Sequence, residues 1–204
     1  SSDLFKEIIP LDKLPADLER LIRFWDLAAT APERGKDPDW SSGCLLGYRK
    51  GLYYLINITR FRGSPLFNEA KIKQIAAIDK IKFGHKVEIL IEQEAGASGK
   101  SLISHYQRNI LSGYSVRGRR PSGDKVVRAG PASSACEAGN VILVQGKYIE
   151  DFFNEIELFG GPSGSVPHDD QVDSFTGAFN EIHNAKPKRK ARQVSWNEGD
   201  QLDD

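Results

Sequence analysis

Carboxylates stand at the ends of predicted elements in three separate parts of the chain. Asp26 ends the apolar run LIRFWD, and Glu92 ends the apolar run VEILIE. A third group, Asp169, Asp170 and Asp173, opens the last predicted helix. Each acid alone has a plainer interpretation, because strand-end acids are usually solvated and an aspartate at a helix start usually caps free N–H groups. Together they form a set of oxygen ligands of the kind that Mg²⁺ and Mn²⁺ prefer.

The spacing of the last group favours a particular pair. Asp170 and Asp173 are three residues apart, so they share one face of a helix. With Asp26 and Glu92, such a set can hold two cations roughly 3.5–4 Å apart, one activating water and the other steadying the leaving oxygen of a phosphodiester. The spacing does not decide which acids of the last helix complete the set of metal ligands, although the D-x-x-D pattern favours Asp170 with Asp173.

These acids can meet only if the strands that carry them are neighbours. The predicted order begins with a β-meander and continues with alternating helices and strands, which predicts an α/β fold with one mixed sheet and helices on both faces. Ligand sites of open sheets lie at the carboxyl ends of strands, so adjacent first and fourth strands would bring Asp26 and Glu92 together. The predicted strands are 21–27, 42–48, 52–59, 87–92, 113–117 and 140–144, and the predicted helices are 65–83, 99–108, 124–138, 148–158 and 168–183.

Composition permits one folded domain with flanking segments. The 204 residues carry no net charge, and two cysteines, Cys44 and Cys136, are too few for a disulfide scaffold or a zinc site. No run approaches the roughly eighteen apolar residues of a membrane span. We expect residues 1–20 to be a linker arm, 21–184 to be the folded domain and 185–204 to be a polar, disordered tail.

Charge is unevenly distributed along the chain although its sum is zero. The charged residues between positions 135 and 184 are mostly acidic, whereas those between positions 100 and 130 are mostly basic. Contacts from that basic zone to DNA phosphates would make binding salt-dependent without reading base sequence. The plainer interpretation is ordinary surface variation. The candidate DNA contacts are Lys100, Arg117, Arg119, Arg120, Lys125 and Arg128.

The segment EAGASGKS imitates a phosphate-binding loop. Gly99, Lys100 and Ser101 fit the pattern G-x-x-x-x-G-K-[ST], but Glu94 stands where the first glycine is required. A carboxylate at that position would repel phosphate. We therefore expect no ATP site and no ATPase activity in this chain.

Five segments, which cover roughly residues 22–183, match a known family. They are RFWDLAAT with the loop KDPDWSSG, GYRKGLYYLINITRFRG, VEILIEQEAGASG, GDKVVRAGPASSACEAGNVILVQG and FGGPSGSVPHDDQVDSFTGAF, and the last two are the most specific. Together they resemble the C-terminal nuclease domain of the large terminase subunit of tailed double-stranded DNA bacteriophages. The resemblance implies an RNase H-like fold with a mixed sheet of five to six strands, and two-metal cleavage of double-stranded viral DNA.

The resemblance also assigns roles to single residues. It makes Asp26 the catalytic metal ligand of the first strand and Glu92 that of the fourth. The paired aspartate of the family keeps Asp169 open as a ligand beside the D-x-x-D pair, and Asp37 or Asp39 is a candidate auxiliary acid.

Cofactors and partners follow from the same resemblance. Lys125 and Arg128 match basic positions of the family, and His168 is a candidate for supporting a ligand or positioning water. The implied cofactors are two Mg²⁺ or Mn²⁺ ions. The implied partners are double-stranded DNA, an ATPase domain upstream in the same polypeptide, the small terminase subunit and the portal, with no membrane. The implied location is the host cell cytoplasm rather than the mature virion.

Two other classes of function use the same features. A junction resolvase or a transposase-type strand-transfer domain would keep the acids and act on a different DNA substrate. A non-catalytic module would grip DNA or a portal-like partner, although a pure DNA binder gains nothing from acids placed beside phosphate. Cleavage assays on linear, branched and end-mimicking DNA distinguish these classes.

Overall fold

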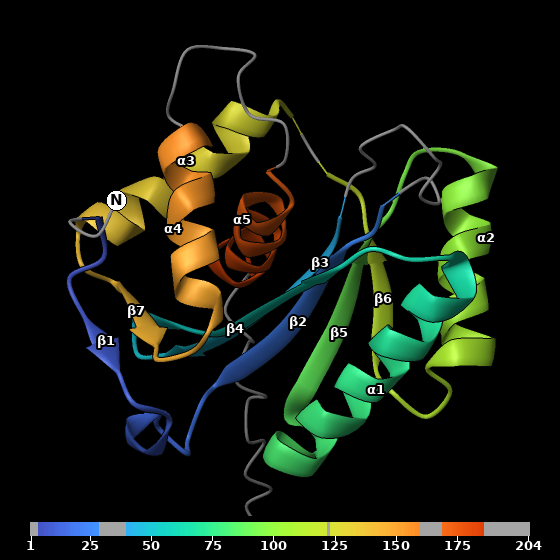
Figure 1. Ribbon diagram of the computed structural model, residues 1–204, viewed down its shortest axis with the longest axis horizontal. Helices are drawn as coiled ribbons and strands as arrows, with labels where there is room; N and C mark the ends of the chain where they lie inside the picture. Colours follow the sequence, from blue (N-terminus) through green and yellow to red (C-terminus); the bar gives the residue numbers. More distant parts are fainter. Residues whose placement is uncertain (1–3, 29–39, 122, 160–168, 186–204) are drawn as a thin grey trace, which may run out of the picture.

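A single mixed sheet organises the chain (Figure 1). The computed structural model describes residues 4–28, 40–121, 123–159 and 169–185. Within these ranges the sheet has seven strands in the order β1-β7-β4-β3-β2-β5-β6. Pairs β2–β3 and β3–β4 are antiparallel, and the other four pairs are parallel. The strands are β1 (Ile8–Ile9), β2 (Arg20–Asp26), β3 (Ser41–Arg49), β4 (Leu52–Phe61), β5 (Val87–Glu92), β6 (Val116–Arg119) and β7 (Val141–Val144).

Helices cover the sheet in two groups (Figure 1). α1 (Pro65–Phe83) and α2 (Ala97–His105) pack against β5 and β6, whereas α3 (Lys125–Glu137), α4 (Tyr148–Phe159) and α5 (Asp170–His183) gather on the side of β2, β3 and β4. The predicted α/β fold with a mixed sheet between helices is thereby confirmed. None of the helices in the described ranges is long and apolar enough to cross a membrane.

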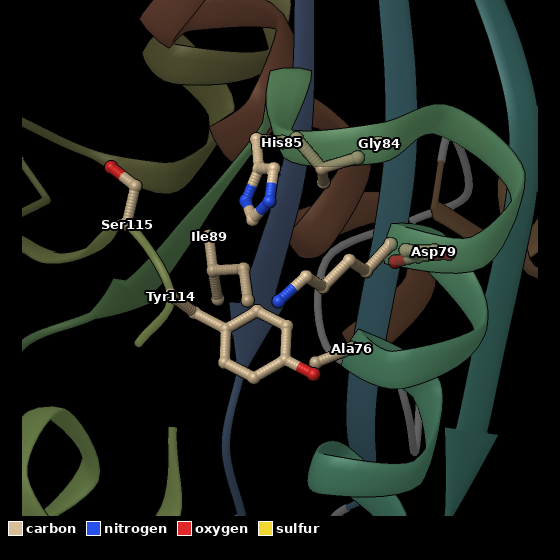
Figure 2. A pocket seen from close by; sticks show the side chains of 9 residues that line it. Ala76, Asp79, Gly84, His85, Ile89, Tyr114 and Ser115 are labelled. Carbon is tan, nitrogen blue, oxygen red and sulfur yellow. The ribbon is translucent and has the colours of Figure 1, made fainter. Parts of the chain in front are cut away.

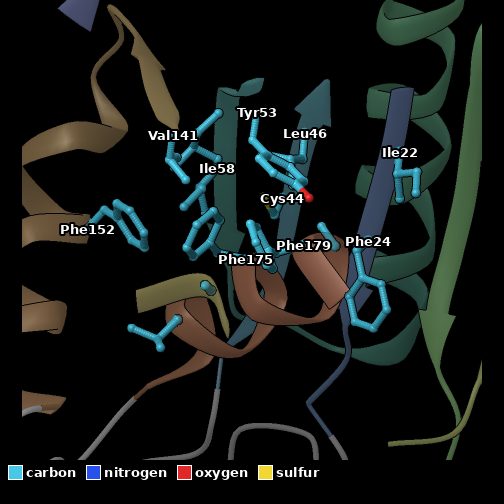
Figure 3. Packing of buried hydrophobic residues seen from close by; sticks show 14 of the residues in the cluster. Ile22, Phe24, Cys44, Leu46, Tyr53, Ile58, Val141, Phe152, Phe175 and Phe179 are labelled. Atoms are coloured by element: carbon cyan, nitrogen blue, oxygen red, sulfur yellow. The ribbon is translucent and has the colours of Figure 1, made fainter. Parts of the chain in front are cut away.

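Strand β2 contributes to the hydrophobic core on both faces of the sheet. Successive strand residues point to opposite faces. Ile22 and Phe24 therefore pack with Phe179 of α5 in one cluster (Figure 3), while Trp25 packs with Ile72 of α1 in another. All five side chains are buried. This two-sided packing fixes β2 at the centre of the fold, and Asp26 is its last residue.

The N-terminal segment differs from the linker arm expected for residues 1–20. Ile8 and Ile9 form β1, which pairs in parallel with β7, and Phe5 is buried in the core. The apolar residues on either side of Pro15 explain the difference, because Leu14 and Leu18 pack against the sheet. The edge strand β1 also brings the strand number to seven, above the five to six expected. The remaining tail, residues 186–204, lies outside the described residues, as do Asp37, Asp39 and His168.

A buried ion pair ties β2 to α1. Arg23 Nε and Nη2 donate to the two carboxylate oxygens of Asp79 at 2.8 and 2.9 Å, and both side chains are buried. Arg23 Nη1 also donates to the carbonyl oxygen of Gly43 (2.9 Å) and to Asn57 Oδ1 (3.2 Å). These bonds satisfy the guanidinium group inside the core, where an unpaired charge would be costly.

Asp79 also borders a small cavity at the end of β5 opposite Glu92. His85, Tyr114 and Ser115 line the same cavity (Figure 2), whose volume is about 20 Å³. A single water molecule needs about 10–15 Å³ of such space. The cavity is therefore too small for a nucleotide or a nucleic acid, and the functional site must be sought elsewhere.

Candidate metal centre

The parallel pairing of β2 with β5 brings two of the predicted acids to one edge of the sheet. In the register of this pair, Trp25 lies opposite Ile91. Asp26 and Glu92 are the next residues of their strands, so they stand side by side at the carboxyl ends. The adjacency that the sequence predicted for these two acids is confirmed.

Small side chains let α5 dock closely on β2 and β3. Ser174 Oγ lies 2.9 Å from Ser42 Oγ, and a Cβ atom on Gly177 would stand 2.4 Å from the ring of Phe24. Asp170 and Asp173 precede these residues by about one helical turn each, on the same side of the helix. The docking of α5 therefore turns its first-turn acids toward the end of β2.

The carboxylates are close enough to affect one another's titration. Burial, reinforced by the negative charges of Glu92, Asp173 and Asp170, raises the pKa of Asp26 well above its ordinary value. Burial likewise raises the pKa values of Glu92 and Asp173, against the opposing charges of Arg128 and Lys125. Mutual repulsion of this kind is typical of sites that bind cations or perform acid–base chemistry.

Two basic residues of α3 lie among these acids. Lys125 Nζ is 2.6 Å from Asp169 Oδ2 and 2.5 Å from Asp173 Oδ2. Arg128 Nη1 is 3.7 Å from Glu92 Oε2. Although burial acts to lower the pKa of Lys125, the hydrogen bonds to the two aspartates raise it. The ammonium group thus occupies a place where a positive charge is strongly favoured.

The donor set fits a hard divalent cation. Its members are carboxylates alone, the ligand class that suits Mg²⁺ and Mn²⁺. Within the described ranges, however, no three Asp, Glu, His or Cys side chains are already arranged to hold an ion. Lys125 lies between two of the carboxylates instead, so its side chain would have to move before an ion could bridge Asp169 and Asp173.

Among the other predicted DNA contacts, Arg119 lies beside Glu92, its partner in the register of β5 and β6, but its side chain turns to another acid. Lys100 is exposed on α2, and Arg120 is exposed just after β6. Arg117 pairs with Glu88, and Arg119 Nε lies 2.6 Å from Glu181 Oε2. The two arginines border a broad hollow of about 1110 Å³ beneath the C-terminal part of α5.

A second hollow opens directly beside Glu92. Its volume is about 350 Å³, and Leu27, Ser41, Asn68 and Glu94 are among the residues that line it. It lies between the carboxyl ends of β2 and β5 and the first turns of α1 and α2. Unlike the small cavity near His85, this hollow gives a ligand access to a predicted catalytic acid.

Sequence reasoning missed two neighbours of the site. Glu155 of α4 is buried, and its carboxylate accepts hydrogen bonds from the first turn of α5. The backbone N–H of Trp40 donates to Asp170 Oδ2 at 3.3 Å. A signal for Glu155 was available, because it follows Phe152 by three residues on the buried face of an amphipathic helix. No sequence signal indicated Trp40.

One protein-family model matches most of the chain. The model of the terminase RNase H-like domain family matches residues 23–181. No curated protein sequence matches the chain.

Solved structures of terminases share this fold. The Mn-soaked nuclease domain of the human cytomegalovirus terminase superposes with a TM-score of 0.62 at 14% identity, covering 89% of this chain and 94% of that one. The nuclease domain of the bacteriophage SPP1 large terminase, with bound Mn, gives 0.56 at 15% identity, covering 87% and 98%. The large terminase of a thermophilic bacteriophage gives 0.60 at 14% identity, and the match covers 89% of this chain but 44% of that one.

Proposed function

The chain belongs to the terminase RNase H-like domain family, and from this membership we propose that it is a metal-dependent endonuclease that cuts double-stranded viral DNA during genome packaging. The observation that carries the proposal is the gathering of Asp26, Glu92, Asp170 and Asp173 at one sheet edge, where the other three acids raise the cost of ionising Asp26. Fixed acids that repel one another in this way favour the binding of cations.

Each element would contribute one part of the centre. Asp26 and Glu92, fixed by strand pairing, would hold cations from the sheet, and Asp170 with Asp173 would hold them from α5. Two bound Mg²⁺ or Mn²⁺ ions would supply an activated water and stabilise the leaving oxygen of a phosphodiester. Arg128, already beside Glu92, is placed to meet phosphate charge at the edge of the site.

The related structures support the choice of ions. The cytomegalovirus domain is described as Mn-soaked and the SPP1 domain as having bound Mn. By family membership we extend the proposal to an upstream ATPase domain, to the small terminase subunit and portal as partners, and to the host cytoplasm as the place of action.

Metal removal tests the proposed activity. Purified protein with Mg²⁺ or Mn²⁺ is expected to convert supercoiled plasmid into nicked and linear forms, because the carboxylates need cations to bring phosphate close. Excess EDTA should abolish the conversion, and added Mn²⁺ should restore it. Agarose electrophoresis measures each form.

Plasmid nicking, together with reactions on other DNA substrates, separates the rival functions. Protein that binds plasmid but never nicks it at any metal concentration would contradict the proposal in favour of a non-catalytic module. Strong preference for a four-way junction over linear duplex would indicate a resolvase. Joining of a labelled DNA end to a target would indicate a transposase-type strand-transfer domain.

Replacing Lys125 by methionine is expected to tighten Mn²⁺ binding about tenfold, equivalent to about 1.4 kcal/mol. The reason is that the ammonium group contacts Asp169 and Asp173 and competes with an ion for their oxygens. Electron paramagnetic resonance of free Mn²⁺ measures the affinity without DNA. Lys100→Met, on the exposed side of α2, serves as the control. Unchanged or weaker binding in Lys125→Met would show that the lysine does not compete.

A further inference from the structure

The first turn of α5 is capped by another helix. An aspartate at the N-cap position usually accepts a hydrogen bond from its own helix, but the side chain of Asp169 makes no such bond. Glu155 of α4 acts instead: its Oε1 accepts from the backbone N–H groups of Gln171 (2.7 Å) and Val172 (2.9 Å). The cap therefore comes from a residue distant from the helix start in sequence.

Glu155 is held firmly in this place. Its side chain is 4% exposed, and its second oxygen, Oε2, accepts from Gln171 Nε2 at 2.8 Å. A negative charge at a helix N-terminus also interacts favourably with the helix dipole. A buried carboxylate with both oxygens in use fixes the position of whatever it binds, here the turn that carries Asp170 and Asp173.

A second path runs from Glu155 to Asp170. Arg60 Nη1 lies 3.9 Å from Glu155 Oε2, and Arg60 Nη2 lies 3.1 Å from Asp151 Oδ2. The guanidinium group of Arg60 stands over the ring of Trp40 at 4.8 Å, and the backbone N–H of Trp40 donates to Asp170 Oδ2. Glu155 thus touches both the backbone that carries Asp170 and the chain of contacts that orients its carboxylate.

We infer that Glu155 is a positioning residue for the metal centre. It fixes the first turn of α5 so that Asp170 and Asp173 face Asp26. Because Glu155 caps the helix, Asp169 is released from capping and its carboxylate reaches Lys125 in the site. The inference rests on the proposed function, since it assumes that these acids hold cations.

Two conservative variants separate geometry from charge. Glu155→Gln keeps the length of the side chain, and its amide oxygen can accept both backbone bonds while the amide of Gln171 turns over. Glu155→Asp keeps the charge but is one methylene shorter, so it cannot reach both N–H groups unless α5 moves. Glu157→Gln and Glu157→Asp, at an exposed position of the same helix, are the matched controls.

The measurement is Mn²⁺ affinity without DNA, alongside the melting temperature. Positioning predicts that Glu155→Asp binds Mn²⁺ about tenfold more weakly or worse, the effect typical of residues that orient metal ligands. Glu155→Gln should stay within about threefold of wild type, because the cap geometry is kept. Hydrogen exchange at the amides of Gln171 and Val172 should be faster in Glu155→Asp alone.

The outcomes distinguish the inference from the proposed function. Folded Glu155→Asp with wild-type Mn²⁺ affinity would overturn the positioning role and leave the proposed function intact. Loss of affinity in Glu155→Gln but not in Glu155→Asp would also overturn it, because charge rather than geometry would then matter. Wild-type protein that binds no Mn²⁺ would overturn the proposed function and this inference with it.

Discussion

Replacing Asp26 by asparagine is expected to reduce metal-dependent plasmid nicking by at least about a hundredfold, since even residues that only orient metal ligands cost about 10–100-fold when lost. Asp26 stands at the centre of the acid cluster, between Glu92 on the neighbouring strand and the acids of α5. Asparagine has the same shape but lacks the charge that attracts a cation. Nicking rates at saturating Mg²⁺ and Mn²⁺ measure the effect.

The same substitution is expected to raise the melting temperature of the metal-free protein at neutral pH. Burial and the neighbouring carboxylates raise the pKa of Asp26 on folding. Above the ordinary pKa of an aspartate the unfolded chain loses this proton more readily than the folded protein, so the raised pKa destabilises the fold at neutral pH. A neutral side chain removes this cost. Added Mn²⁺ should stabilise wild-type protein more than Asp26→Asn, because the ion binds the folded state.

A matched control separates these effects from general changes in charge. Asp12→Asn removes one exposed acid from the N-terminal segment and should alter neither nicking nor melting. Wild-type nicking by Asp26→Asn would remove Asp26 from the proposed centre. A lower melting temperature would instead show that Asp26 has a structural role that the raised pKa does not indicate.

Replacing Asp79 by asparagine is expected to destabilise the protein by about 3–5 kcal/mol, the usual cost of removing one partner of a buried ion pair. Arg23 would remain inside the core, with the carbonyl of Gly43 and the amide of Asn57 as weaker partners. Urea unfolding should show a lower midpoint with an unchanged slope. The melting temperature should fall by on the order of 10 °C.

Two comparisons test whether burial causes this loss. Asp17 pairs with Arg49 at 2.7 Å, but its side chain is 68% exposed, so Asp17→Asn should destabilise the protein far less than Asp79→Asn. A double variant, Arg23→Met with Asp79→Leu, should recover much of the stability lost by Asp79→Asn, because no buried charge is left unpaired. Equal losses at positions 17 and 79 would contradict the account.

The sequence was most informative where local pattern and chemistry coincide. Asp26 and Glu92 end apolar runs. Their strands, β2 and β5, are neighbours because the chain returns through the helix α1 to the side of β2 after the meander β2–β3–β4. D-x-x-D spacing at a helix start placed Asp170 and Asp173 near them. Which of the three acids of that region bind an ion stays a prediction, since Lys125 now contacts Asp169 and Asp173.

The partners of buried charges could not be predicted. Arg23 lies in an apolar strand, Asp79 on the buried side of α1 and Glu155 on the buried side of α4. Each charge at a core position signals that a partner exists, but only the packing of distant elements decides which one. The N-terminal segment was misjudged for a similar reason: two isoleucines carry little pattern until β7 offers an edge to pair with.

The position of α5 in the chain has a consequence for biosynthesis. This helix follows every strand of the sheet in the chain. It nevertheless supplies Asp170 and Asp173 to the proposed centre and the aromatic side chains Phe175 and Phe179 to the core. Polypeptides emerge from the ribosome N-terminus first. A nascent chain that stops before α5 holds Asp26 and Glu92 without the acids that complete the set. Under the proposed function, the ability to cut DNA would therefore arise only when the core closes, and truncated translation products would leave DNA uncut.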